Sequence, residues 1–171
     1  MADSIANPAA EEVEMQIRGL MMDPVTNMPI VVLKDIASDR VLPIWVGIFE
    51  ANAIALELEK TTTPRPMTHD LMRNLARGLN AVVRKVVVSE LRDDTFFAVI
   101  WMEQGGEIIA LDSRPSDAIA LALRWDCPIY AARVVLDNAR QVADGAQSSS
   151  SDEMRRWLEN LGDDEMGRYK M

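Results

Sequence analysis

The chain has 171 residues, of which 49% are apolar and 26% charged, and this is typical of one globular domain that needs no disulfide or metal to hold its core. A formal net charge of −9 argues against electrostatic capture of nucleic acid by the chain as a whole, because phosphate binding depends on Lys and Arg. The single Cys127 excludes an internal disulfide, and without a signal-peptide pattern or a membrane-length apolar run we expect a cytoplasmic protein with no membrane partner.

The first half of the chain predicts three strands followed by a helix. Residues 1–12 are small, polar and acidic and are expected to form a disordered tail before a domain that spans residues 13–140. The strands are predicted at residues 14–22, 30–33 and 41–46. Pro43 has no N–H to donate to a ladder, which places the third strand at an edge or at a bulge. The helix runs through EANAIALELEK, residues 50–60.

The second half repeats this order. Strands are predicted at residues 82–91, 95–102 and 107–112, with Gly105-Gly106 as a hairpin signal, and a helix at residues 116–125. Both helices contain the tetrapeptide AIAL, and residues 118–123 are apolar on every face, which indicates a buried helix. We therefore predict an α+β fold of two duplicated β-β-β-α units, with a mixed sheet and buried Ala/Leu/Ile helices.

A basic helix is predicted between the two units. Thr68 is a good N-cap, Leu71, Leu75 and Leu79 form an apolar stripe at helical spacing, and Arg73 and Arg77 form a ridge on another face. The window from Lys60 to Lys85 holds six basic residues and one acid, for a net charge of +5 (six minus one). If the chain meets phosphates, we expect this window to face them.

The last part of the chain reads as a short strand at residues 127–131 and a helix at residues 133–140. Residues 141–151 are rich in serine and predict a flexible linker. A capping box, Ser150 to Glu153, opens a short helical segment at residues 152–171. The repeated apolar helix, four Trp and eleven Met indicate more apolar surface than one subunit hides, so we predict a homodimer or a higher homo-oligomer.

Several of these stretches, taken together, resemble the bifunctional nuclease domain family of bacteria and plants. The similarity runs from about Val13 to Asp137 and is carried by LMMDPVTNMPIVVLKD, RVLPIWVGIFEANAIALELE, RPMTHDLMRNL, RPSDAIALALRWDCPIY and the closing MGRYKM. One departure is Ile48, which stands where the family pattern leads us to expect proline. The resemblance implies a compact α+β domain that forms homo-oligomers and cuts both RNA and DNA. It carries no settled catalytic constellation with it.

Chemistry then suggests roles for the residues at the ends of the predicted elements. Hydrolysis of a phosphodiester needs an activated water, neutralised phosphate charge and a stabilised leaving oxygen, and carboxylate-bound Mg²⁺ or Mn²⁺ commonly supplies these. The candidate catalytic residues are Glu50, His69 and Asp70. The candidate substrate-binding residues are Arg65, Arg73, Arg77, Arg114 and Ser116, and the candidate metal ligands are Asp112 and Asp117.

Each candidate also has a purely structural interpretation. Asp70 and Asp117 sit in first helical turns, where an acid is stabilised by the helix dipole, and Ser116 suits a cap. Arg114 suits a structural bridge to Asp112 or Asp117 as well as it suits phosphate binding. Two functions follow: a metal-assisted nuclease of low sequence specificity or, as the alternative, a non-catalytic homo-oligomeric regulatory or ligand-binding module.

Overall fold

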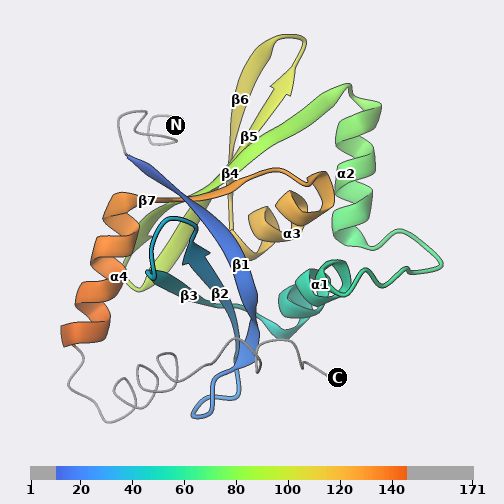
Figure 1. Ribbon diagram of the computed structural model, residues 1–171. Coiled ribbons are helices and arrows are strands. Elements are labelled where there is room, and N and C mark those ends of the chain that lie inside the picture. The colour runs from blue at the N-terminus through green and yellow to red at the C-terminus, as the bar shows by residue number, and fades with distance from the viewer. Residues whose placement is uncertain (1–10, 146–171) are drawn as a thin grey trace.

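The computed structural model describes residues 11–145 of the chain, and side chains as far as Ala139. Its elements are, in chain order, β1 (Glu12–Met22), β2 (Pro29–Asp35), β3 (Val41–Trp45), α1 (Ile48–Leu58), α2 (Thr68–Gly78), β4 (Ala81–Arg92), β5 (Thr95–Gln104), β6 (Glu107–Ser113), α3 (Pro115–Trp125), β7 (Ile129–Ala132) and α4 (Arg133–Gly145) (Figure 1). Only the last two residues of the predicted N-terminal tail fall in this range, and the predicted segment at residues 152–171 lies outside the described residues.

All seven strands belong to one mixed sheet, in the order β3-β2-β1-β7-β4-β5-β6. Every neighbouring pair is antiparallel except β4 and β7, which are parallel. Two three-stranded meanders thus flank β7, and each meander leads into a helix, α1 or α3. This confirms the α+β class and the repeated β-β-β-α order. Pro43 lies in β3 at the edge of the sheet, as its missing N–H predicted.

The β5–β6 hairpin turns at the predicted glycine pair. Gly105 and Gly106 have φ of 60° and 86°, so both central residues of the turn are left-handed. Such a turn matches the twist of the flanking strands, and glycine adopts it without a steric cost from Cβ. The hairpin places β6 at the second edge of the sheet, directly before α3.

The two AIAL helices pack against each other, and α2 packs against α3 (Figure 1). The prediction of a buried helix is confirmed most fully for α3, in which Ala118, Ile119 and Ala120 have at most 1% of their surface exposed. Helix α1 buries only the side that carries Ala51, Ile54 and Ala55. Phe49, in its first turn, is 85% exposed. The core therefore includes the contact between the sheet and α3, and α1 covers it from the side.

The apolar stripe of α2 has the predicted helical spacing but faces outward. Leu71 and Leu75 are 62% and 63% exposed, Leu79 is also exposed, and His69 is the buried residue of this helix. Helix α2 thus attaches to the domain by its N-terminal turn and its contacts with α3, and it leaves its leucines uncovered.

Helix α4 follows β7 without a break and packs against β7, β4 and β3. Val135 and Leu136 are buried in the core. The helix continues to Gly145, five residues past the boundary expected at residue 140, so its end occupies the start of the range 141–151 that was predicted as a linker.

Candidate active site

The first turns of α1, α2 and α3 carry four of the titratable residues selected from the sequence. Glu50, Asp70 and Asp117 are each the third residue of their helix, and His69 is the second residue of α2. Free backbone N–H groups and the helix dipole favour an acid at this position. The repeated fold therefore brings helix starts that are far apart in the sequence to one place.

Four of these side chains form one hydrogen-bonded cluster, which we call the Arg114 cluster: Glu50, His69, Arg114 and Asp117. Arg114 Nε donates to Asp117 Oδ2 at 2.8 Å, and Arg114 Nη1 donates to Glu50 Oε1 at 3.0 Å. The other oxygen of Asp117, Oδ1, lies 2.9 Å from His69 Nε2. Both oxygens of Asp117 are thereby used, one to hold the imidazole and one to hold the guanidinium.

The electrostatics of the Arg114 cluster favour the ionised forms of Asp117 and Arg114. Burial opposes ionisation of Asp117, but the hydrogen bonds from Arg114 and His69 outweigh it and hold its pKa below the ordinary value. The hydrogen bond from Arg114 to Asp117, reinforced by Glu50, raises the pKa of Arg114. The Arg114 side chain is 64% exposed and that of His69 only 10%. A ligand that arrives from solvent therefore meets the guanidinium first.

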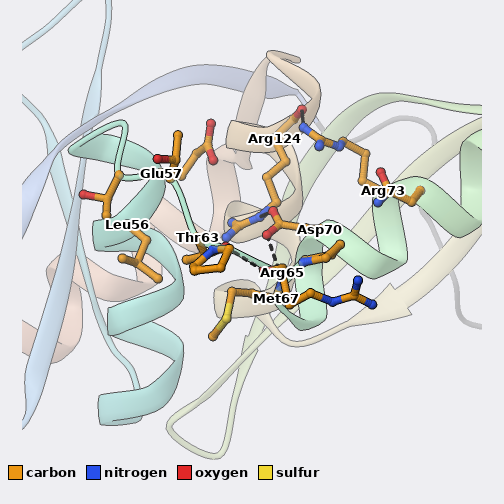
Figure 2. Close-up of a pocket in the computed structure, with 13 residues that line it drawn as sticks. Leu56, Glu57, Thr63, Arg65, Met67, Asp70, Arg73 and Arg124 are labelled. Atoms are coloured by element: carbon orange, nitrogen blue, oxygen red, sulfur yellow. Dashed lines mark hydrogen bonds and ion pairs between the residues drawn. The ribbon is translucent and has the colours of Figure 1, made fainter.

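Asp70 belongs to a second network, centred on Arg124. Arg124 Nε donates to Asp70 Oδ1 at 2.7 Å, and the second oxygen, Oδ2, accepts from the backbone N–H of Met67 at 2.9 Å. Figure 2 shows the Asp70 and Arg124 side chains pointing toward each other. Burial opposes ionisation of Asp70, but these two hydrogen bonds outweigh it and lower its pKa.

Sequence reasoning gave Arg124 no role, yet its side chain is only 2% exposed and joins three helices. Besides Asp70 on α2, it donates to the carbonyl oxygen of Ala120 on α3 at 2.9 Å and to that of Ala53 on α1 at 3.1 Å. The one available signal was a lone arginine that directly follows the apolar run of residues 118–123. Its partners lie up to 71 residues away and could not be read from the local pattern.

The observed N-caps of α2 and α3 differ from those expected from the sequence. Thr68 is the first residue of α2 and Met67 is its N-cap, so the expected Thr68 cap is wrong, and Asp70 satisfies the Met67 N–H instead. Helix α3 has Arg114 as its N-cap, with Pro115 at its first position. Ser116, the second residue of α3, is buried, and the start of this helix has no side-chain capping bond.

The remaining candidates lie apart from the Arg114 cluster. Arg65 is exposed in the connection from α1 to α2, and Arg77 is exposed on α2 with its guanidinium 5.0 Å from the centre of the Trp125 ring. Arg73 is half-buried and donates to the Arg124 carbonyl oxygen at 3.4 Å. Asp112 is exposed on β6, and within the described residues it takes no part in the hydrogen bonds of the cluster.

The donor set does not fit a divalent metal as it stands. Within the described part of the chain, no three His, Cys, Asp or Glu side chains are grouped to hold an ion. Glu50 and Asp117 supply hard carboxylate oxygens, but the guanidinium of Arg114 lies between them and pairs with both. A metal at this position would have to displace Arg114.

Comparison with known proteins agrees with the fold and the motifs. The model of the bifunctional nuclease domain matches residues 31–144, more than half of the chain, and this range contains the whole Arg114 cluster. The chain belongs to the bifunctional nuclease domain family. Between residues 11 and 145, this family member has no helix of the length and apolarity needed to cross a bilayer.

Relatives of this bifunctional nuclease domain occur in bacteria and plants. Two uncharacterized proteins of Mycobacterium tuberculosis, from strains H37Rv and CDC 1551, are 39% identical to it over 126 residues, which cover 74% of this chain and 75% of theirs. The protein named bifunctional nuclease 1 of Oryza sativa subsp. japonica is 28% identical over 134 residues, which cover 76% of this chain and 40% of the rice protein.

Proposed function

We propose that the protein is a nuclease that hydrolyses phosphodiester bonds of RNA and DNA with low sequence specificity. The family and the name of the rice relative support the reaction class. The observation that carries the proposal is the Arg114 cluster, because a chain of hydrogen bonds links an exposed guanidinium, two carboxylates and an imidazole.

The chemistry of these groups suggests a division of roles. Arg114, the most exposed of them, binds the non-bridging oxygens of the phosphate, to which a planar guanidinium is well matched. Glu50 is then free to accept a proton from the attacking water, whose oxygen bonds to phosphorus. His69, held through Nε2 by Asp117, supplies a proton from its other nitrogen to the leaving oxygen as the P–O bond breaks. Asp70 is assigned a positioning role, because both of its oxygens are engaged.

Assistance by Mg²⁺ or Mn²⁺, with Asp112 and Asp117 as ligands, stays a prediction. Such an ion would polarise the phosphate and lower the pKa of a bound water. Because Arg114 already neutralises Asp117, we assign stabilisation of the phosphate charge to the guanidinium. The assay below is therefore run both with and without a metal ion.

Nucleic acid would approach over the basic window from Lys60 to Lys85. Arg77 and Arg65 are exposed in it, and both lie on or next to α2, the helix that carries His69. Neutralising phosphates in this way requires no base contacts, which agrees with low sequence specificity.

A homo-oligomer is the second part of the proposal. The exposed leucines Leu71 and Leu75 of α2, with Leu79 at its C-cap, line one side of an amphipathic helix that nothing else in the described chain covers. An apolar helix face of this kind is suited to self-association through a symmetric contact.

A non-catalytic homo-oligomeric regulatory module is the competing proposal. It is favoured by one specific observation: Glu50 and Asp117 are already paired with Arg114, and His69 is almost fully buried. An arrangement with every charge satisfied is what a purely structural network would also have.

One assay distinguishes the nuclease from the regulatory module. It measures turnover of single-stranded and duplex RNA and DNA by highly purified protein, with EDTA, Mg²⁺ or Mn²⁺. The nuclease proposal requires cleavage that falls in His69→Ala and co-purifies with the protein. Cleavage that is the same in wild type and His69→Ala would assign it to a contaminant and leave the regulatory module. A dependence on Mg²⁺ or Mn²⁺ that EDTA abolishes would support the metal.

A further inference from the structure

A cavity of about 300 Å³ lies between the end of α1, the connection from α1 to α2, and the first half of α2. None of the four residues of the Arg114 cluster lines it. Its polar lining includes Thr61, Thr62 and Asn74. Thr63 also lines it and donates to the carbonyl oxygen of Arg65 at 2.7 Å, which holds the connection in place (Figure 2).

The cavity has an excess of positive charge. Three arginines line it, Arg65, Arg73 and Arg124, against two acids, Glu57 and Asp70. Each acid has its own cation, since Asp70 pairs with Arg124 at 2.7 Å and Glu57 with Lys60 at 3.6 Å. Within the described residues, Arg65 and Arg73 form no ion pair. In a chain with a net charge of −9, two guanidiniums at one cavity without an ion pair of their own indicate an anionic ligand.

Arg73 also lacks a hydrogen-bond acceptor. Its Nε is buried and has no partner among the described residues, and its Nη1 reaches the Arg124 carbonyl oxygen only at 3.4 Å. A buried N–H without an acceptor is costly, and native structures rarely leave one unexplained. An anionic ligand that drew the Arg73 side chain toward the cavity would supply the missing acceptor.

One part of the cavity wall is apolar. Leu56, Pro64, Pro66 and Met67 contribute it, and Figure 2 shows Leu56 and Met67 among the lining side chains. Inorganic phosphate would leave this surface unused. A phosphate that carries a flat organic group would use both parts, with the charge at the arginines and the ring against Met67 and the prolines.

We propose that this cavity binds a phosphate monoester carried on a nucleoside. The phosphate oxygens accept hydrogen bonds from Arg65, Arg73 and the hydroxyls of Thr61 and Thr62, and the base packs on the apolar wall. A free mononucleotide and the terminal nucleotide of a nucleic-acid chain present the same group. The inference goes beyond the proposed nuclease activity, because binding here requires no bond to be cleaved.

Isothermal titration calorimetry of the full chain with AMP, adenosine and inorganic phosphate tests the site. We expect AMP to bind at least ten-fold more tightly than adenosine or inorganic phosphate. Arg73→Gln, and separately Arg65→Gln in the exposed connection, should each weaken AMP at least ten-fold. The matched control is Arg92→Gln, the same loss of charge at the end of β4 and away from the cavity, which should leave the Kd within two-fold. A thermal melt of each variant verifies folding.

A pair of oligonucleotides, identical except for a 5′ phosphate, distinguishes the two sources of the ligand. A gain in affinity from the 5′ phosphate that is lost in Arg73→Gln identifies a chain end, and a gain seen with AMP alone identifies a free mononucleotide. Equal affinity for AMP and adenosine, or equal effects of Arg73→Gln and Arg92→Gln on AMP, would overturn the proposal. Because the readout is binding, failure of the nuclease proposal, which appears only in turnover, does not alter this result.

Discussion

His69 and Asp117 lie 48 residues apart in the chain and meet at 2.9 Å, joining the first turn of α2 to the first turn of α3. The carboxylate fixes which imidazole nitrogen faces it, since Nε2 is the atom in contact. The other oxygen of Asp117 accepts from Arg114, so the orientation of the imidazole and of the guanidinium proposed to bind phosphate depends on one side chain.

If this pair performs proton transfer, His69→Gln should lower kcat for phosphodiester cleavage about 100-fold, the lower end of what general acid–base groups contribute. Glutamine can still donate to Asp117 but cannot deliver a proton at neutral pH, so the loss would report proton transfer and not orientation alone. Single-turnover cleavage of a labelled oligonucleotide measures it. Asp94→Asn, the same type of neutral substitution in the β4–β5 turn, is the control. A kcat within two-fold of wild type in His69→Gln would exclude His69 from the chemistry.

Arg124 should be the most important charged residue for stability. Replacing it with Met removes three hydrogen bonds and leaves Asp70 without its cation, and breaking a buried pair on one side costs about 3 kcal/mol or more. Urea unfolding of wild type, Arg124→Met, Asp70→Asn and the double variant measures the coupling. Additive losses in this cycle would contradict the role of Arg124 as the joint between α1, α2 and α3.

Features of the fold that depend on local pattern could be predicted, and those that depend on distant partners could not. Pro43 at an edge and the glycine pair in a hairpin follow from backbone chemistry within a few residues. The sequence also placed several candidate residues at predicted helix starts, where the structure has them. From the sequence alone, either Asp112 or Asp117 could be the partner of Arg114. In the structure Arg114 pairs with Asp117 and also with Glu50, which lies 64 residues away.

Burial was the least predictable property, because it depends on what packs on each face. The AIAL tetrapeptide is identical in α1 and α3, yet α3 is covered on most sides and α1 on one. Likewise, helical spacing of Leu71, Leu75 and Leu79 indicates an apolar face without indicating whether the core or another subunit covers it.

That exposed face yields a prediction about assembly. Leu75→Glu should convert an oligomer into a monomer at micromolar concentration, because a charge would be buried in the contact. It should change the free energy of unfolding of the subunit by no more than about 0.5 kcal/mol, since the side chain is 63% exposed. Sedimentation velocity measures the assembly. Val25→Glu, at a similarly exposed position in the β1–β2 loop, is the control, and an unchanged oligomer in Leu75→Glu would place the contact elsewhere.

The stability of the fold should be sensitive to acid because of two buried carboxyls, Asp23 and Asp35, in the half of the sheet formed by β1, β2 and β3. Burial opposes ionisation of Asp23, but hydrogen bonds from Thr26, Trp45 and the Val25 amide outweigh it and lower its pKa to about 2. Hydrogen bonds from Ser38, the Ala37 amide and Arg40 lower the pKa of Asp35 to about 2 as well, against opposition from burial.

The folded pKa of each group is below the ordinary value of 3.8, so the unfolded chain binds more protons between about pH 4 and pH 2. The stability that these groups contribute is complete above about pH 4 and is lost as the pH falls toward 2. Urea unfolding at pH 5 and pH 2.5 should show wild type losing more stability than Asp23→Asn or Asp35→Asn. Asp39→Asn, at a fully exposed side chain, should follow wild type, and parallel losses in all four proteins would refute the assignment.

Gly47 should act on the site through Glu50. It is the N-cap of α1, and a Cβ at this position would overlap the Glu50 carboxylate, which folds back over it. Its φ of −69° is open to alanine, so Gly47→Ala should cost at most about 1 kcal/mol while turning Glu50 away from Arg114. Cleavage should then fall as far as in Glu50→Gln, and combining the two substitutions should add nothing. Gly78→Ala, in α2 with open space around the added methyl, should cleave like wild type. If Gly47→Ala also cleaves like wild type while Glu50→Gln does not, the glycine has no part in positioning the carboxylate.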